Sequence, residues 1–272
     1  MNDYSITELE SIAKKLRRHV ITMISAAGSG HPGGSLSAAD IVTALYFKVL
    51  RHNPADPHWS DRDRFVLSKG HAAPILYAAL AESGYFPIEW LSRLRKTDSC
   101  LQGHTDSNMT PGVDASAGSL GQGLSIGIGM AIAAKLDGKS YHTFVLLGDG
   151  ECDEGQVWEA ALAGPNLKVD NLTAVVDYNK LQLDGFTKDI MNLEPFIEKW
   201  KSFKWNVIEI DGHNMAQIVE TLLKARNNQD NPTVIIAHTI KGKGVSFMEN
   251  NVDFHGRAPN KEETEQALKE LA

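Results

Sequence analysis

The chain has 272 residues, 42% hydrophobic and 22% charged, so it can bury a full core as one large domain or two small ones. Its formal net charge is -7, and its basic residues at 14–18 ("KKLRR") are interleaved with a helix pattern. Both features argue against binding of nucleic acid. The two cysteines, Cys100 and Cys152, form no CxxC pair and no disulfide framework, which fits a protein of a reducing compartment. With neither a signal peptide nor a membrane-spanning apolar run, we expect a cytoplasmic protein without membrane contact.

The first half of the chain predicts helices separated by glycine-containing loops. Apolar residues recur at helical spacing from Ile6 to Ile24, and Ser5 with Glu8 forms a capping box. A second helix is expected to begin near Ser37, and residues 65–84 predict a short strand, a turn and a helix. Five glycines follow between 118 and 129. Each costs about 1 kcal/mol against alanine in an exposed helix, so we expect close packing there.

The second half predicts a parallel sheet. Continuous apolar strands are expected at 143–147, 172–177, 205–210 and 233–238, separated by helices at 155–163, 193–201 and 214–227. Strands without alternation, joined by helices, indicate a doubly wound α/β fold with a mainly parallel sheet and helices on both faces. We expect one domain over 1–272, with a helix-rich part (about 1–140) packed on the sheet region (about 141–260).

Acidic and amide side chains follow two of these strands. Asp149 lies between Gly148 and Gly150 at the end of one strand, and Asn179 lies just beyond the next. If the strands are neighbours, both side chains face one crevice at the carboxyl edge of the sheet, where α/β proteins bind ligands. Their hard oxygen ligands suit Mg²⁺ or Ca²⁺ bound to a phosphate, and Gly150 lets the backbone approach that ligand. The other interpretation is a glycine turn with a capping aspartate and an unrelated asparagine.

Five blocks of sequence resemble one family in the same order. The stretch "GDGECDEGQVWEAALAGPNLKVDNLTAVVDYNKLQLDG" resembles the thiamin-diphosphate-binding motif of transketolases. The blocks "SGHPGGSLSAADI", "LSKGHAAPILYA", "GSLGQGLSIGIGMA" and "HTIKGKGVSFMEN…FHG" are similar to the same family. The resemblance covers about residues 10–260 and implies the fold of the family's diphosphate-binding domain.

The resemblance also implies roles for individual residues. Asp149, Asn179 and the carbonyl of Leu181 would hold the cation. Contacts to thiamin diphosphate would come from His71, Gly118, Ser119, Leu120, Gly150, Asn179, Lys241 and His255. Many relatives carry a serine that touches the cofactor where this chain has Gly34. That contact is therefore expected to be absent.

Four histidines in glycine-flanked loops carry the substrate prediction: His31, His71, His104 and His255. A single histidine in a loop usually just lies at the surface. Four histidines in such loops form a polar cluster that suits the binding of hydroxyl groups and proton transfer near neutral pH. The resemblance implies that they line a substrate channel. It also implies that Glu154 joins an acidic path between paired active sites, although an acid in the first turn of a helix is the simpler interpretation. Glu151 and Asp153 are expected to be solvated.

The family's second, pyrimidine-binding domain has no counterpart in this chain. We therefore expect the N-terminal subunit of a split transketolase, or a piece of a longer protein. Its partner would be a C-terminal transketolase subunit with the pyrimidine domain and a C-terminal domain, two copies of each forming a heterotetramer. The expected reaction moves a two-carbon ketol unit from xylulose 5-phosphate to ribose 5-phosphate.

Three other functions remain open from the sequence. One is another thiamin-diphosphate enzyme, such as the α chain of a 2-oxo acid dehydrogenase, which should lack the four-histidine set and "SGHPGG". The second is a ketol transferase for an unusual sugar. The third is a non-catalytic assembly subunit, which predicts losses at the cation positions, and Asp149 and Asn179 are both in place.

Overall fold

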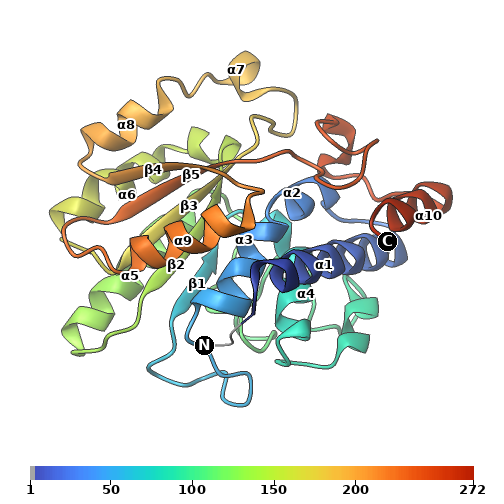
Figure 1. Ribbon diagram of the computed structural model, residues 1–272, viewed down its shortest axis with the longest axis horizontal. Helices are drawn as coiled ribbons and strands as arrows, with labels where there is room; N and C mark the ends of the chain where they lie inside the picture. Colours follow the sequence, from blue (N-terminus) through green and yellow to red (C-terminus); the bar gives the residue numbers. More distant parts are fainter. Residues whose placement is uncertain (1–3) are drawn as a thin grey trace.

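The computed structural model describes residues 4–272. At its centre lies a sheet of five parallel strands in the order β1-β2-β3-β5-β4 (Figure 1). The strands are β1 (Arg64–Leu67), β2 (Thr143–Gly148), β3 (Leu172–Tyr178), β4 (Asn206–Asp211) and β5 (Thr233–His238). The predicted parallel sheet is thus confirmed. β2 and β3 are neighbours, so Gly148 pairs with Asp177 and the chain leaves both strands at one edge.

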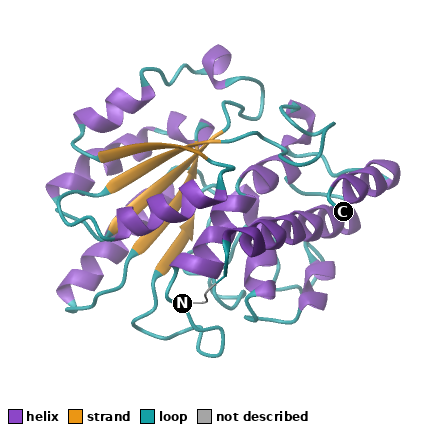
Figure 2. Cartoon of the chain, viewed as in Figure 1, coloured by secondary structure: helices purple, strands orange, loops and turns teal. Residues whose placement is uncertain are grey.

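Helices cover both faces of the sheet, as predicted (Figure 2). Successive residues of β2 show this, because Phe144 and Leu146 lie in one buried cluster while Val145 and Leu147 lie in the other. The first cluster joins α1 (Ile6–Ala27), α2 (Pro32–Ser37), α3 (Ala39–Ala44), α4 (Ala73–Glu82), α9 (Met215–Arg226) and α10 (Lys261–Glu270). The second joins α5 (Gln122–Leu136), α6 (Gly155–Asn166) and α8 (Phe196–Ser202). Burial on both faces explains why the strands read as continuous apolar runs.

Several helix boundaries follow from local chemistry. Ser5 and Glu8 form the predicted capping box of α1. The helix predicted to begin near Ser37 is α3, which begins at Ala39. A separate short helix, α2, precedes it from Pro32, a residue suited to the first position of a helix. After α3 the chain makes a short π-helix, η1 (Leu45–Val49). The helix expected from 193 begins only at Phe196, after Pro195 in an extended conformation.

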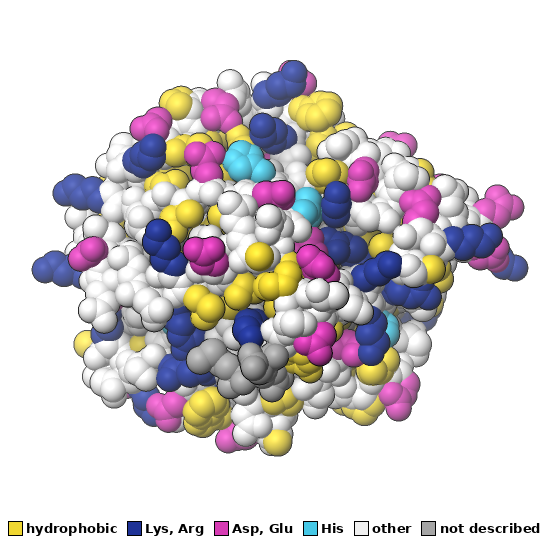
Figure 3. Space-filling model, viewed as in Figure 1, with side chains coloured by type: hydrophobic (Ala, Val, Ile, Leu, Met, Phe, Trp, Pro, Cys, Tyr) yellow, Lys and Arg dark blue, Asp and Glu magenta, His cyan; other side chains and the backbone are white. Residues whose placement is uncertain are grey.

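Short helical turns fill the connections: η2 (Gly70–Ala72), η3 (Ile88–Arg93), η4 (Gly150–Asp153), α7 (Thr187–Ile190) and η5 (Val252–His255). Near the end of the chain α10 packs on α1, and Arg18 donates to the carbonyl oxygens of Leu268 and Leu271 at 2.7 and 3.2 Å (Figure 1). On the face shown in Figure 3, basic and acidic side chains are interspersed. Within residues 4–272, every helix is too short or too polar to span a bilayer.

Candidate active site

The predicted cation ligands meet where β2 and β3 end. Asp149 follows β2 directly and is 1% exposed. One of its carboxylate oxygens accepts the N–H of Gly150 at 2.7 Å, and the other accepts the N–H of Lys180. Burial, and next the nearby Asp177, raise the pKa of Asp149 to about 7. A bound cation would favour the ionised form of this buried carboxylate, so the site fits a divalent metal.

Leu181 and Lys241 complete this corner of the site. The carbonyl oxygen of Leu181 accepts a hydrogen bond from Lys241 Nζ at 2.8 Å, and Asn179 Oδ1 accepts the N–H of Leu181 at 3.1 Å. Lys241 is 2% exposed, and burial lowers its pKa to about 8. The ammonium of Lys241 therefore already lies against one of the predicted cation ligands. Within residues 4–272 no three His, Cys, Asp or Glu side chains form a group that could hold a metal ion. The predicted cation site accordingly contains one carboxylate, that of Asp149, beside an amide and a carbonyl oxygen.

The structure brings the four predicted histidines together from four separate loops. The rings of His71 and His255 stack with their centroids 5.2 Å apart. The ring of His31 lies 5.5 Å from that of His71, 5.6 Å from that of His255 and 6.2 Å from that of His104. His255 Nδ1 also lies 2.7 Å from Lys241 Nζ, which joins the histidine cluster to the cation corner.

Burial and neighbouring cations keep these imidazoles neutral near pH 7. Burial, followed by Arg95, lowers the pKa of His31 to about 4, and burial followed by Lys241 lowers that of His255 to about 3. The pKa values of His71 and His104 are lowered too, chiefly by burial. An ammonium or guanidinium can only donate, so Nδ1 of His255 accepts from Lys241 and Nδ1 of His31 accepts from Arg95. Both rings therefore carry their proton on Nε2, where each can donate to a substrate oxygen.

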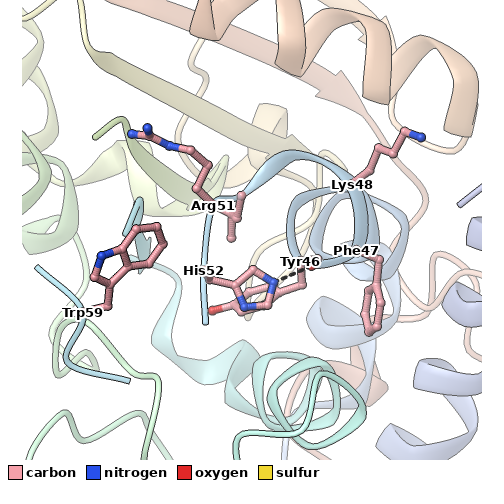
Figure 4. A pocket seen from close by; sticks show the side chains of 7 residues that line it. Tyr46, Phe47, Lys48, Arg51, His52 and Trp59 are labelled. Carbon is pink, nitrogen blue, oxygen red and sulfur yellow. Dashed lines mark hydrogen bonds between the residues drawn. The ribbon is translucent and has the colours of Figure 1, made fainter. Parts of the chain in front are cut away.

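A hollow of about 590 Å³ opens beside this cluster, lined by Gly28, Ser29, Leu183, Val252, Asp253, His255, Gly256, Arg257 and Ala258. A second hollow, of about 230 Å³, lies near the start of β1, at the opposite end of the strands (Figure 4). Its histidine, His52, contacts the carbonyl of Tyr46 at 2.8 Å and the hydroxyl of Tyr85 at 3.1 Å. Both ring nitrogens of His52 are thus engaged by the protein, and of these two hollows it is the one lined by His255 that adjoins the predicted residues.

Behind the histidines lies a buried ion pair that was not among the predicted site residues. Lys69, between β1 and η2, pairs with Asp177 at the end of β3, and both side chains are almost fully buried. Asp177 also accepts hydrogen bonds from the hydroxyls of Ser37 and Thr239. These contacts, led by the charge of Lys69, hold the pKa of Asp177 below its usual value despite burial. Charged residues at the carboxyl ends of parallel strands were the signal that could have identified both residues.

Glu151 is buried, so the prediction that it is solvated is wrong. It is 3% exposed, and its carboxylate accepts the hydroxyl of Ser68 and the N–H groups of Gly121 and Gly148, each N–H at 2.9 Å. The glutamate thus ties the end of β2 to the turns after β1 and before α5. Asp153, by contrast, is only half-buried and contacts Gln182 at 3.2 Å.

The predicted glycine contacts are of different kinds. Gly118 lies against His104, because a Cβ on Gly118 would come within 3.4 Å of that ring, and Ser119 and Leu120 continue the loop toward α5. At Gly150 a Cβ would meet Gln182 at 2.8 Å, so a side chain of the protein fills this space.

Gly34 and Glu154 complete the predicted set. A Cβ on Gly34 would lie 3.1 Å from His71 Nε2 and 3.3 Å from Lys69 Nζ, which leaves little room for a serine. Glu154 is exposed at the N-cap of α6, where it packs against Gly121. Its role in an acidic path stays a prediction.

Comparison with known proteins identifies the family of this chain. Residues 9–272 match the family described as "Transketolase, thiamine diphosphate binding domain". The chain is similar to a 6-deoxy-6-sulfo-D-fructose transketolase subunit from Clostridium sp. (strain MSTE9), with 45% identity over 97% of this chain and 96% of that protein. It is 44% identical to one of the subunits of apulose-4-phosphate transketolase from Actinobacillus succinogenes, over 100% of this chain and 99% of that one.

The fold matches a longer protein of known structure. The crystal structure of transketolase from Campylobacter jejuni superposes with a TM-score of 0.92 and 32% identity, over 98% of this chain and 43% of that chain. The chain thus spans less than half the length of that transketolase. Together with the match over residues 9–272, this shows that the chain belongs to the transketolase family, as its thiamin-diphosphate-binding N-terminal part.

Proposed function

We propose that this chain is the cofactor-binding subunit of an enzyme that reversibly transfers a two-carbon ketol unit from a ketose phosphate to an aldose phosphate. The observation that carries the proposal is the row of neutral histidines that runs from the cation corner to the adjoining hollow. Neutral imidazoles offer donors and acceptors for sugar hydroxyls. Asp149, Asn179 and Leu181 would hold Mg²⁺ or Ca²⁺, and Lys241 and His255 would meet the diphosphate.

When bound, thiamin diphosphate would supply the electron sink that stabilises the two-carbon fragment. The protein orients the sugar and handles its protons. His31 and His255 donate through Nε2 to substrate oxygens, and His71 stacks on His255 and fixes its ring. His104 is exposed and adjoins the other histidines through His31, so its ring can exchange protons with solvent. Glu154 would join an acidic path between paired sites.

The proposal extends to a partner. A C-terminal transketolase subunit would supply the pyrimidine-binding domain, two copies of each chain would assemble, and the complex would work in the cytoplasm. The names of two relatives as subunits and the 43% coverage of a longer transketolase support this arrangement.

The donor is proposed to be xylulose 5-phosphate and the acceptor ribose 5-phosphate. A second candidate is a less common sugar, because two relatives of similar length are named for 6-deoxy-6-sulfo-D-fructose and apulose 4-phosphate.

The test is a ketol-transfer assay with thiamin diphosphate and Mg²⁺, on this chain alone and mixed with the protein encoded beside it. We expect activity only in the mixture. Full turnover by the chain alone would refute the split arrangement. In the mixture, His31→Ala and His104→Ala should weaken use of the donor more than binding of the cofactor. His238→Ala is the matched control, because this exposed histidine pairs with Glu209 outside the cluster.

A further inference from the structure

His213 connects a buried ion pair to the loop that carries Lys241, and it was not among the predicted site residues. It follows β4 at the carboxyl edge of the sheet, and only 12% of its side chain is exposed. Its Nδ1 lies 2.8 Å from Asp40 Oδ2 in α3, and its Nε2 accepts the N–H of Ile240 at 2.8 Å. The imidazole therefore bridges a helix on one face of the sheet and the loop that follows β5.

These contacts fix the tautomer of His213. A backbone N–H can only donate, so Nε2 offers its lone pair and the proton of the neutral ring lies on Nδ1, where it donates to Asp40. Arg17 of α1 holds Asp40 in turn, because Nη1 and Nη2 donate to the two carboxylate oxygens at 2.9 and 2.6 Å. Although burial raises the pKa of Asp40, the hydrogen bond from His213 and the charge of Arg17 lower it overall. The carboxylate is therefore ionised, and it orients the ring.

The N–H that His213 binds belongs to the residue directly before Lys241. Ile240 lies two residues past the end of β5, so its N–H meets the imidazole instead of a neighbouring strand. On the other side of Lys241, the N–H of Gly242 donates to the carbonyl oxygen of Gly33 at 3.0 Å. The lysine is thus flanked by two anchored amides, which set the point from which its side chain starts.

The ammonium of Lys241 depends on that starting point. Nζ lies 2.8 Å from the carbonyl oxygen of Leu181 and 2.7 Å from His255 Nδ1, and the residue is 2% exposed. A lysine side chain is a flexible stem, and its ammonium is a point charge without the rigid fork of a guanidinium. A shift of the backbone would therefore draw Nζ away from both partners, and away from the diphosphate that it is proposed to meet.

Building on the proposed function, we propose that His213 is a positioning residue for Lys241, and through it for the cofactor diphosphate. Asp40 orients the imidazole, the imidazole anchors the N–H of Ile240, and this anchor sets the position of the lysine backbone. His213 thus acts through Lys241 rather than by contact with the cofactor. The Arg17–Asp40 pair ties α1 to α3 without any histidine, so the bond that serves the site is the one to Ile240.

The test separates the two hydrogen bonds of His213 with two amide side chains. The shorter amide in His213→Asn replaces Nδ1 and can still donate to Asp40, but it stops short of Ile240. The longer amide in His213→Gln places its oxygen near the position of Nε2 and can accept from Ile240. Each variant is assembled with the protein encoded beside this chain. Calorimetric titration with thiamin diphosphate and Mg²⁺ measures the affinity, and urea denaturation measures stability.

We expect His213→Asn to weaken thiamin diphosphate by about tenfold, as for other residues that orient a ligand-binding group. His213→Gln should stay within about threefold of the unaltered complex, because it keeps the anchor on Ile240. The matched control is His238→Asn, the same substitution at an exposed histidine that pairs with Glu209. Its affinity should change less than about twofold. A histidine that only ties Asp40 in place would give the reverse order, with His213→Gln the weaker of the two.

Coupling to Lys241 provides the second readout. Lys241→Met removes the ammonium and should weaken thiamin diphosphate by at least about tenfold. Since His213 acts through this ammonium, His213→Asn should cost less than about twofold more in the Lys241→Met background. Full additivity of the two substitutions, or an affinity for His213→Gln no better than that of His213→Asn, would overturn the inference. An unaltered complex that binds no thiamin diphosphate, or an unchanged affinity in Lys241→Met, would instead refute the proposed function, and the inference would fall with it.

Discussion

The ammonium of Lys69 pairs with the carboxylate of Asp177 where neither side chain reaches water, with exposed fractions of 1% and 0%. The pair links the turn after β1 to the end of β3, directly behind Gly34 and His71. Removal of one partner from a buried pair leaves an uncompensated charge.

We therefore expect Asp177→Asn to lower the free energy of unfolding by about 3–5 kcal/mol, measured by urea denaturation of the chain. Lys69→Met should destabilise the chain as well. The double variant should be more stable than the sum of the two single effects predicts, because it leaves no unpaired charge. Strict additivity of the two substitutions would show that the pair is not coupled.

Asp149 supplies the only carboxylate of the predicted cation site. Asp149→Asn keeps the shape of the side chain but removes the charge that a divalent cation needs. In the assembled enzyme we expect thiamin diphosphate affinity to fall by at least about tenfold and to lose its dependence on Mg²⁺. Calorimetric titration with and without Mg²⁺ measures both effects. Asp153→Asn, one turn further on, is the control and should bind normally; unchanged affinity in Asp149→Asn would refute the metal assignment.

The sheet could be predicted from the sequence because each strand is buried on both faces and therefore continuously apolar. The strand expected at 233–238 matches β5, and those at 143–147 and 172–177 differ from β2 and β3 by a single residue. Helix starts were harder. The helix expected near Ser37 corresponds to α3, which begins at Ala39, but the preceding helix α2 was not predicted, because the sequence before Ser37 is rich in glycine and reads as a loop.

Within the site, residues flanked by glycines were identified and residues defined by contacts between distant loops were not. His31, His71, His104 and His255 stood out by their local sequence, and the structure brings them together. Arg95 has no such flanking signal. It adjoins the cluster through His31, and its side chain is positioned by a hydrogen bond to Ser29, 66 residues away. Glu151 was expected to be solvated, but its three hydrogen-bond partners come from turns that the sequence cannot place together.

The glycines of α5 offer a paired test of close packing. A Cβ on Gly127 would lie 2.4 Å from Val145 Cγ2 in β2, whereas a Cβ on Gly129 would have no atom within 4 Å. Gly127→Ala should therefore destabilise the isolated chain by about 1–3 kcal/mol through overpacking. Gly129→Ala should be neutral or stabilise the helix by up to about 1 kcal/mol. Thermal unfolding of both variants measures the difference, and equal melting temperatures would contradict the packing of α5 against β2.

Acid should destabilise the chain through its buried histidines, and His142 isolates one contribution. His142 is 4% exposed, contacts Thr173 Oγ1 at 2.8 Å and packs 4.7 Å from the ring of Phe144. Burial lowers its pKa from 6.5 to about 3. Between these values the unfolded chain binds a proton that the folded chain does not, so the free energy of unfolding falls as the pH drops below 6.5.

For His142 alone this loss is about 2 kcal/mol between pH 7 and pH 5, because each pH unit below 6.5 contributes about 1.4 kcal/mol. His142→Gln removes the titrating group and keeps a polar partner for Thr173. The variant should be less stable than the unaltered chain at pH 7, and the gap should narrow by about 2 kcal/mol at pH 5. Urea denaturation at both values, in metal-free buffer, measures the gap. His31, His71 and His255 titrate in both proteins and cancel in the comparison, so a gap that stays constant would show that His142 is protonated in the folded chain.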